Sequence, residues 1–360
     1  MERPSIDLDS ESPKKKSRMS ETTTDQFPKA TLYIFKTSIW SSVPLLGLIE
    51  KGYNENEYNL KEVDLFKGEN FCPEFLRLNP KGTVPLLVVP VINPEPDHPQ
   101  RFKSITDSER ILDFLDLSRK PQNTHHSNEN PAPTLTPAII STKFDADRLI
   151  NLIQDGSVDL NFLKLGSLIQ FTHVDFGNDE TVKMKEFFEN RIRALETFME
   201  INPTATNSMK AFWKDRLKAD QITLSILASN ATEEAEQDFL NRARKIWRNC
   251  VVMLTRIAQS ISSNKGDYIL GEQISLVDLH AGAWIVRLFY ILGFTGKPSL
   301  SFKSDSGTEV YQRLVKMLQA VNSSEIDEEE VRDVCDGIIK YWNTLSVRES
   351  FKKVYVQGFH

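Results

Sequence analysis

Residues 79–87 read Asn-Pro-Lys-Gly-Thr-Val-Pro-Leu-Leu, a polar turn that runs directly into an apolar run. Proline has no backbone N–H, so Pro85 suits the first position of a strand better than its interior. A cis bond before proline is typical of tight turns. Here it would turn the N–H and the carbonyl of Val84 away from the sheet. Such a pair of backbone groups can bind an extended peptide by strand-like pairing.

A second group of residues suited to binding lies at 106–109, where the sequence is Thr-Asp-Ser-Glu. The spacing is that of a capping box, with Thr106 at the N-cap and Glu109 three residues later. A helix that starts here leaves the N–H of Ser108 among the unpaired donors of the first turn, where the helix dipole favours an anion. The Ser108 hydroxyl adds a donor, and Asp107 could accept from an ammonium group. Simple capping is compatible with both roles.

Three serines, Ser38, Ser41 and Ser42, lie in a polar loop before a predicted helix, with Trp40 among them. If a ligand with a thiol bound here, a serine hydroxyl that donates a hydrogen bond to its sulfur at the helix N-terminus would lower the pKa of that thiol. The effect matters because a free thiol, with a pKa of about 8.5, is mostly protonated at neutral pH. Ser41 or Ser42 can also cap the helix and place Pro44 in its first turn, where proline is tolerated.

The elements that must position these residues follow a strand–helix–strand–strand–strand–helix order. They are a strand at 31–35, a helix from Ser41 or Ser42 to about Gly52, a strand at 58–66, a short helical segment at 73–78, strands at 86–89 and 101–105, and a helix from 106 to about 117. The first strand–helix–strand unit predicts parallel strands with a right-handed crossover. The third and fourth strands are expected to pair as a hairpin. The prediction is an α/β domain with a mixed four-stranded sheet.

From about residue 138 onward the apolar spacing is helical, and no convincing strand is found. Helical ranges are expected at 148–154, 181–201, 205–228, 233–262, 276–292, 309–321 and 328–342. We therefore predict a disordered N-terminal tail at 1–28, the α/β domain at 29–118, a proline-rich linker at 119–137 and an all-α domain at 138–360.

The composition excludes several classes of protein. The chain has 360 residues, a length expected for two domains, and its net charge of −6 argues against a general nucleic-acid binder. The three cysteines are widely spaced and form no metal or disulfide framework, which suits a reducing compartment. There is neither a secretory leader nor a run of apolar residues that could span a membrane. We expect a cytoplasmic protein with no nucleic-acid or membrane partner.

Taken together, these features resemble the glutathione S-transferase superfamily, and most closely its divergent, fungal-type cytosolic members of the serine type. The resemblance is carried by residues 32–33, 50–53, 63–80, the cis-proline motif at 81–87, the acidic-Ser pair at 107–108, and the capping box with its hydrophobic staple at 271–280. It covers most of 30–118 and parts of 140–292. It implies a thioredoxin-like N-terminal domain (βαβ-ββα), an all-α C-terminal helical bundle, and glutathione as co-substrate without a metal.

The resemblance also implies a catalytic residue. Counted without gaps from the first-strand motif, Ser38 falls where serine-type members keep their catalytic serine. Those members usually continue with Ser or Pro and small residues, whereas Ile39 and Trp40 follow here. Ser41 and Ser42 therefore remain alternatives, as does a shifted loop in which Trp40 lines the thiol site.

The remaining glutathione contacts implied by the resemblance are distributed along the tripeptide. They are Val84 and Pro85 for the cysteinyl segment, Asp107 and Ser108 for the γ-glutamyl end, Asn70 and Lys81 for the glycyl carboxylate, and Trp40 beside the thiol. A solvated loop lysine is an equal alternative for Lys81. No cysteine lies in 36–44, which disfavours thiol transferase and dehydroascorbate reductase activity. Cys72 is expected in the loop after the second strand, where nothing places it near a helix N-terminus, and it is interpreted as a structural or incidental thiol.

The expected function is a glutathione transferase that conjugates the thiolate of glutathione to a small hydrophobic electrophile, as a cytoplasmic homodimer in detoxification. The alternatives are a non-catalytic binder of glutathione or hydrophobic ligands, a regulatory transferase-like protein, and glutathione-dependent ether cleavage or isomerisation. The electrophile cannot be inferred from the sequence. Trp284, Phe289 and Tyr290 share a helix, but aromatic residues at helical spacing are more often core. Ser275 and Asp278 are expected to form a structural cap.

Overall fold

The computed structural model describes residues 28–91, 101–119, 132–165, 167–169, 173–175, 179–294, 309–321, 327–358 and 360, with side-chain detail omitted for 164–180. Apart from residue 28, the tail expected to be disordered lies outside the described residues. The same is true of 120–131 in the predicted linker.

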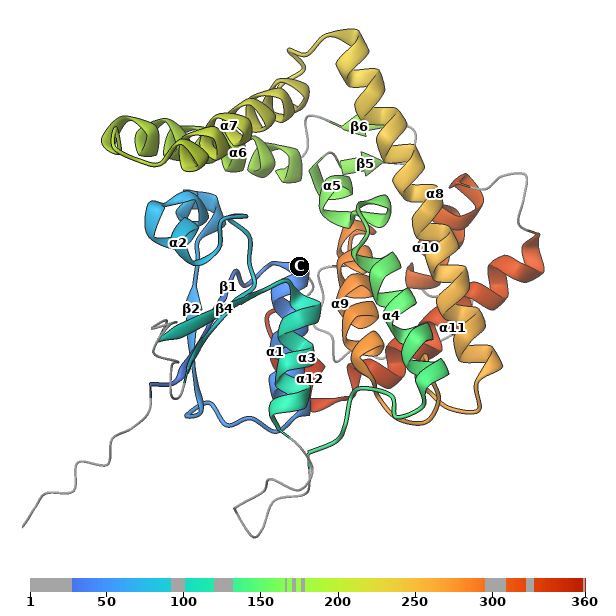
Figure 1. Ribbon diagram of the computed structural model, residues 1–360. Helices are drawn as coiled ribbons and strands as arrows, with labels where there is room; N and C mark the ends of the chain where they lie inside the picture. The colour runs from blue at the N-terminus through green and yellow to red at the C-terminus, as the bar shows by residue number, and fades with distance from the viewer. Residues whose placement is uncertain are drawn as a thin grey trace, which may run out of the picture.

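The N-terminal part is built around a four-stranded sheet in the order β2-β1-β3-β4. The strands are β1 (Ala30–Ile34), β2 (Tyr58–Glu62), β3 (Leu86–Pro90) and β4 (Phe102–Thr106). β1 pairs parallel to β2, and β3 pairs antiparallel to both β1 and β4. Helices α1 (Ile39–Glu50) and α3 (Ser108–Ser118) lie side by side next to the sheet (Figure 1). This is the mixed, thioredoxin-like sheet that the sequence predicts.

β2 ends earlier than predicted, at Glu62 instead of residue 66. The carboxylate of Asp64 accepts hydrogen bonds from the backbone N–H groups of Phe66 and Lys67, which turns the chain into a 3₁₀ helix, η1 (Leu65–Lys67). A second 3₁₀ helix, η2 (Glu69–Phe71), and the short helix α2 (Pro73–Leu78) follow. A side chain that bonds its own following backbone competes with strand pairing.

The rest of the chain is mostly helical, as predicted. Its helices are α4 (Ile140–Gln154), α5 (Leu160–Leu165), α6 (Asp179–Ile201), α7 (Asn207–Leu227), α8 (Glu233–Ser263), α9 (Leu276–Ile291), α10 (Glu309–Val321), α11 (Glu328–Ser346) and α12 (Glu349–Val354), with the 3₁₀ helix η3 (Gly156–Val158) before α5. The expectation of no strand after residue 138 is wrong, because β5 (Ser167–Ile169) and β6 (His173–Asp175) form a short antiparallel pair. Strands of three residues are too short for an alternating pattern to be recognised.

Helix α9 lies at the centre of the main hydrophobic core and packs against α1 of the sheet domain. Trp284 and Phe289 are fully buried, so their interpretation as core residues is confirmed. The buried carboxylate of Asp278 accepts hydrogen bonds from the N–H and hydroxyl of Ser275, the N–H of Ile269 and the hydroxyl of Tyr341. The predicted structural cap of this helix is therefore also confirmed.

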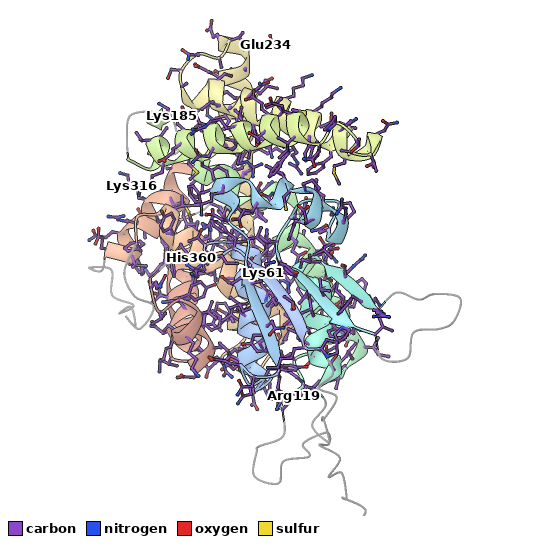
Figure 2. All side chains as sticks on the ribbon, turned by 90° about the vertical axis from the view of Figure 1, so that its left-hand side faces the viewer. Lys61, Arg119, Lys185, Glu234, Lys316 and His360 are labelled. Atoms are coloured by element: carbon purple, nitrogen blue, oxygen red, sulfur yellow. The ribbon has the colours of Figure 1, made fainter. Side chains whose placement is uncertain are left out.

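Helices α6 and α7 form an antiparallel hairpin that lies over η1, η2 and α2 of the sheet domain (Figure 1). The indole N–H of Trp213 on α7 donates to the carbonyl of Phe71, at 2.9 Å. In Figure 2, Lys185 on α6 and Glu234 on α8 lie at one end of the molecule and Arg119 at the other. Within the described residues, no helix has both the length and the apolarity needed to cross a membrane.

Candidate active site

The Val84–Pro85 peptide bond is cis, as predicted. Val84 lies two residues before Leu86, the first residue of β3 to pair with β1 and β4. Within the part of the chain that the structure describes, no backbone hydrogen bond engages Val84. The turn before it is held by side chains, because the amide of Asn79 donates to the carbonyl of Thr83 at 2.7 Å. Within the described residues, the N–H and the carbonyl of Val84 are thus left without backbone partners at the start of β3.

Ser38 is the N-cap of α1, and its Oγ accepts a hydrogen bond from the N–H of Ser41 at 3.3 Å. A hydroxyl that accepts in this way still has its own proton to donate. The prediction that Ser41 or Ser42 caps the helix is wrong, because the helix begins at Ile39. Pro44 therefore lies inside the helix and not in its first turn.

The other two serines are directed into the protein. Ser41 and Ser42 are 0% and 1% exposed. The Ser41 Oγ accepts from the N–H of Phe35 at 3.2 Å, and the Ser42 hydroxyl donates to the carbonyl of Ser38 at 3.3 Å. Of the three serines, only Ser38 lines the cavity described next. The spacing of the three serines in the sequence does not show which of them faces the cavity, but their burial does.

A cavity of about 320 Å³ lies between the sheet domain and the helices α6, α7 and α9. Of the predicted site residues, Ser38, Trp40, Asn70 and Val84 line it, whereas Lys81, Pro85, Asp107 and Ser108 do not. Three phenylalanines form an aromatic wall: Phe35 and Phe66 have ring centroids 5.9 Å apart, and Phe66 and Phe187 5.0 Å apart. Such a wall suits an apolar or aromatic ligand.

Arg287 of α9 also lines this cavity, and it was missed in the sequence. It is 2% exposed, and its guanidinium donates to the Thr37 carbonyl at 2.6 Å, to Asn161 Oδ1 at 2.7 Å and to the His360 carbonyl at 2.8 Å. It therefore ties α9 to the loop that carries Ser38. The signal in the sequence was the one arginine in a mostly apolar helix, because such a charge needs partners when it is buried.

Asn70, predicted as a contact of the glycyl carboxylate, lies on the cavity wall with one end of its side chain already bonded. Its Nδ2 donates to the carbonyl of Gly82 at 2.7 Å, and within the described residues its buried Oδ1 has no hydrogen-bond partner. The atom left without a partner is an acceptor, which suits a ligand N–H and does not suit the glycyl carboxylate assigned to this residue.

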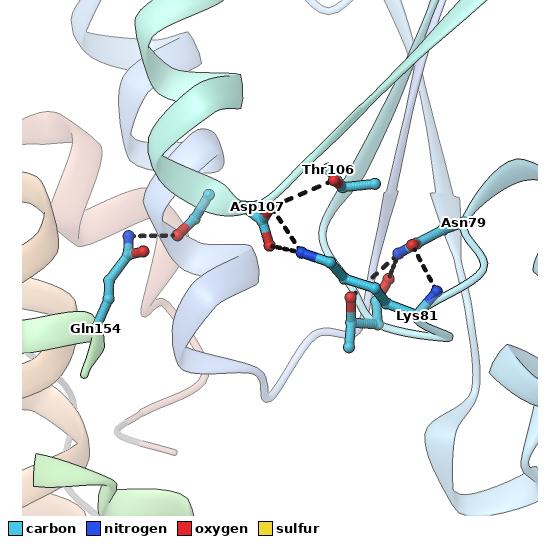
Figure 3. Close-up of polar contacts among 7 residues, drawn as sticks. Asn79, Lys81, Thr106, Asp107 and Gln154 are labelled. Atoms are coloured by element: carbon cyan, nitrogen blue, oxygen red, sulfur yellow. Dashed lines mark hydrogen bonds and ion pairs between the residues drawn. The ribbon is translucent and has the colours of Figure 1, made fainter. Parts of the chain in front are cut away.

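Lys81 and Asp107 form an ion pair, with Nζ 3.3 Å and 3.2 Å from the two carboxylate oxygens (Figure 3). Lys81 is therefore near the residues predicted for the γ-glutamyl end of the ligand. Asp107 has φ 71°, and it occupies the N-cap of α3 without a side-chain capping bond. The predicted capping box of Thr106 and Glu109 does not form, because Thr106 is the last residue of β4 and pairs with Leu86.

Ser108 is the first residue of α3, and its N–H is one of the first-turn donors without a helical partner. Its hydroxyl is 3.1 Å from the amide nitrogen of Gln154 in α4, from which it accepts a hydrogen bond (Figure 3). The Ser108 hydroxyl, expected to contact the ligand, therefore already accepts a hydrogen bond from the helical part of the chain. A bond between residues this far apart in the sequence has no local signature.

Cys72 is the N-cap of α2, and its Sγ accepts from the N–H of Phe75 at 3.4 Å. The expectation that it lies away from any helix N-terminus is therefore wrong. Burial is the largest influence on this thiol and raises its pKa, so the helix terminus does not produce a reactive thiolate. Among the described residues, no group of three or more His, Cys, Asp or Glu side chains could hold a metal.

Comparisons with known proteins identify the N-terminal part. Residues 37–117 match the family model described as "Glutathione S-transferase, N-terminal domain". Glutathione S-transferase 1 of Dianthus caryophyllus is 47% identical over 60 residues, 17% of this chain and 26% of that protein. Maleylacetoacetate isomerase maiA of Aspergillus fumigatus is 29% identical over 169 residues, 47% of this chain and 64% of that protein. These matches span less than two thirds of each relative.

Solved structures with a similar fold include the β-etherase LigF of Sphingobium sp. strain SYK-6, with 17% identity, coverage of 92% of this chain and 100% of that chain, and a TM-score of 0.49. Gtt2 of Saccharomyces cerevisiae has 15% identity, coverage of 90% and 99%, and a TM-score of 0.44. Together with the thioredoxin-like sheet and the cis proline before β3, the match over residues 37–117 identifies this part of the chain as an N-terminal domain of the glutathione S-transferase type.

Proposed function

We propose that this protein is a glutathione transferase that conjugates the thiolate of glutathione to a hydrophobic electrophile. The observation that carries the proposal is that a single cavity is lined by Ser38 at the start of α1, by Val84 beside the cis bond, and by an aromatic wall. These are the parts the reaction needs: a hydroxyl for sulfur, a backbone for the tripeptide and an apolar site for the second substrate.

In this proposal the backbone of Val84 pairs with the cysteinyl segment of glutathione. The N–H of Ser108 receives the γ-glutamyl carboxylate at the start of α3, and Asp107 accepts from the ammonium group. The buried Oδ1 of Asn70 accepts from a ligand N–H. Lys81 neutralises Asp107 before the ligand binds.

The thiol then lies over the N-terminus of α1. There the hydroxyl of Ser38 donates to sulfur, and the helix dipole stabilises the negative charge. Both effects lower the pKa of the bound thiol, so that more thiolate is present at neutral pH. The thiolate attacks the electrophile held between Trp40 and the aromatic wall, and the leaving group departs with its electron pair.

The test is conjugation of glutathione to 1-chloro-2,4-dinitrobenzene by the purified protein. We expect Ser38→Ala to lower kcat/KM about 100-fold, the cost typical of losing one donor to a developing anion. Ser104→Ala, on the exposed β4, is the matched control and should change nothing. If Ser41→Ala, in a protein shown to be folded, abolished conjugation while Ser38→Ala did not, the assignment of Ser38 would be wrong.

A second candidate, glutathione-dependent isomerisation, is favoured by the 169-residue match to a maleylacetoacetate isomerase. The two reactions differ in their net consumption of glutathione, because conjugation consumes one glutathione per turnover and isomerisation regenerates it. Measuring free thiol during turnover of maleylacetoacetate distinguishes them. Retention on a glutathione resin without turnover of any electrophile would support a non-catalytic binder instead.

We also propose that the protein acts in detoxification as a cytoplasmic homodimer. Size-exclusion chromatography with light scattering measures the mass directly, and a monomer at micromolar concentration would refute the dimer.

A further inference from the structure

We propose that the second substrate is an aromatic electrophile bearing a carboxylate, and that Arg216 binds this carboxylate. The inference rests on the proposed transferase function and specifies the substrate class of the same cavity.

The cavity is positively charged. Arg191, Arg216 and Arg287 all line it, and none of its lining residues within the described ranges is acidic. A concave site with cations and apolar walls concentrates the field of those cations and favours an anionic ligand.

Two of the three arginines are bonded to other groups of the protein. The guanidinium of Arg191 donates to the carboxylate of Asp220 at 2.9 and 3.3 Å, and it lies 4.4 Å from the ring centroid of Phe71. Arg287 donates to the three oxygens already described, including the Thr37 carbonyl. Both side chains are held in place as parts of the wall.

Arg216 differs from them. It is exposed, it lies on α7 one turn before Asp220, and its guanidinium is 5.6 Å from the ring centroid of Phe212. Within the described residues it forms no ion pair, because Asp220 is bonded to Arg191. Its planar guanidinium can hold a carboxylate through two parallel hydrogen bonds.

The position of Arg216 favours the second substrate over glutathione. The proposed glutathione contacts, Val84 and Ser108, belong to the sheet domain. Arg216 comes from the opposite wall, which also supplies Met184 and Phe187 of α6. An aromatic ring stacked on the aromatic wall would share the cavity with Arg216.

The probe is a matched pair of electrophiles, 4-chloro-3,5-dinitrobenzoate and the neutral 4-chloro-3,5-dinitrobenzamide. In both, the glutathione thiolate forms a C–S bond at the chlorinated carbon, the C–Cl bond breaks, chloride leaves with the electron pair, and the thiol proton goes to solvent. Each rate is divided by the uncatalysed rate with glutathione, which removes the difference in intrinsic reactivity.

We expect the normalised kcat/KM of the benzoate to exceed that of the benzamide about 10-fold, as for one partly exposed charge-assisted contact. Arg216→Ala should remove this preference and leave the benzamide and the KM for glutathione within about 2-fold. Lys218→Ala, an exposed cation on the same helix, should leave the preference intact. Equal losses for both electrophiles, or a raised KM for glutathione alone, would overturn the inference.

Binding of the two product conjugates, measured by calorimetry, separates this inference from the proposed function. If no electrophile is turned over but the benzoate conjugate binds about 10-fold more tightly through Arg216, the transferase proposal fails and the anion site stands. If both electrophiles are conjugated and the two conjugates bind equally, the transferase proposal stands and the anion site fails.

Discussion

The two walls of the cavity are built in different ways. The wall from the sheet domain presents backbone groups and a helix cap, at Val84 and Ser38, from elements that follow one another within residues 37–117. The opposite wall presents side chains of α6, α7 and α9. In the sequence, α8 and its flanking loops separate α9 from the pair α6 and α7. The first wall is thus set by local chain geometry, and the second by long-range packing.

This difference assigns the walls different tasks. Backbone groups at a strand start and a helix N-terminus recognise features common to any peptide or anion. Side chains such as Phe187 and Arg216 can change without disturbing the sheet, so under the proposed function they are the positions suited to selecting the second substrate. We therefore expect a change at Val84 in the first wall to affect glutathione, and changes at Phe187 and Arg216 in the second wall to affect the electrophile.

The largest expected effect is a loss of stability at low pH caused by His280 of α9, the helix that supplies Arg287 to the second wall. Burial lowers the pKa of His280 on α9 from 6.5 to about 4, so the folded protein keeps this group neutral while the unfolded chain binds a proton. Stability should therefore fall as the pH drops from 6.5 toward 4, by about 1.4 kcal/mol per pH unit and about 3 kcal/mol in total. Urea unfolding at several pH values measures it.

The control for this prediction is His280→Gln, which cannot titrate. The difference in free energy of unfolding between the two proteins should shrink or reverse in favour of the variant as the pH falls through this window. A constant difference from pH 7 to pH 4 would show that His280 does not carry the effect.

An intermediate effect is expected where the two walls meet. Trp213→Phe removes the hydrogen bond to the Phe71 carbonyl and leaves a smaller ring in a fully buried site, which should cost about 2 kcal/mol of stability. Faster hydrogen exchange confined to α6 and α7 would confirm that this bond holds the hairpin on the sheet domain. Trp284→Phe, inside the α9 core, should instead accelerate exchange in α9, and identical exchange patterns would contradict the comparison.

The smallest effect is expected at Asp107, which belongs to the sheet domain but lies outside the cavity lining. Asp107→Asn keeps a residue that tolerates the observed φ of 71° but removes the charge proposed to bind the ammonium group of glutathione. We expect the KM for glutathione to rise about 10-fold and the KM for the electrophile to stay the same. Steady-state kinetics with each substrate varied in turn provides the check. A change in the electrophile KM would show that the walls are not independent.

Much of the first wall could be predicted because its signals are local. The order of strands and helices along 30–118 follows from residues close together in the chain, as does the cap formed by Asp278 at the start of α9. The cis bond at Pro85 was predicted from its context among the neighbouring motifs, because the local stretch alone favours a trans bond. The errors are local as well. The start of α1 was predicted a few residues too late, so Ser41 or Ser42 was expected at the N-cap position that Ser38 occupies. At the start of α3, Thr106 was expected at the N-cap position that Asp107 occupies.

The sequence by itself determined that a proline opens β3, that serines precede α1 and that an acidic-Ser pair precedes α3, since turn, cap and strand preferences act over a few residues. Only the tertiary structure decided which serine faces a cavity, that Lys81 pairs with Asp107, and that Arg191, Arg216 and Arg287 converge on one wall. The physical reason is that burial and ion pairing depend on which distant helices pack together, and periodicity within one helix does not specify its partners.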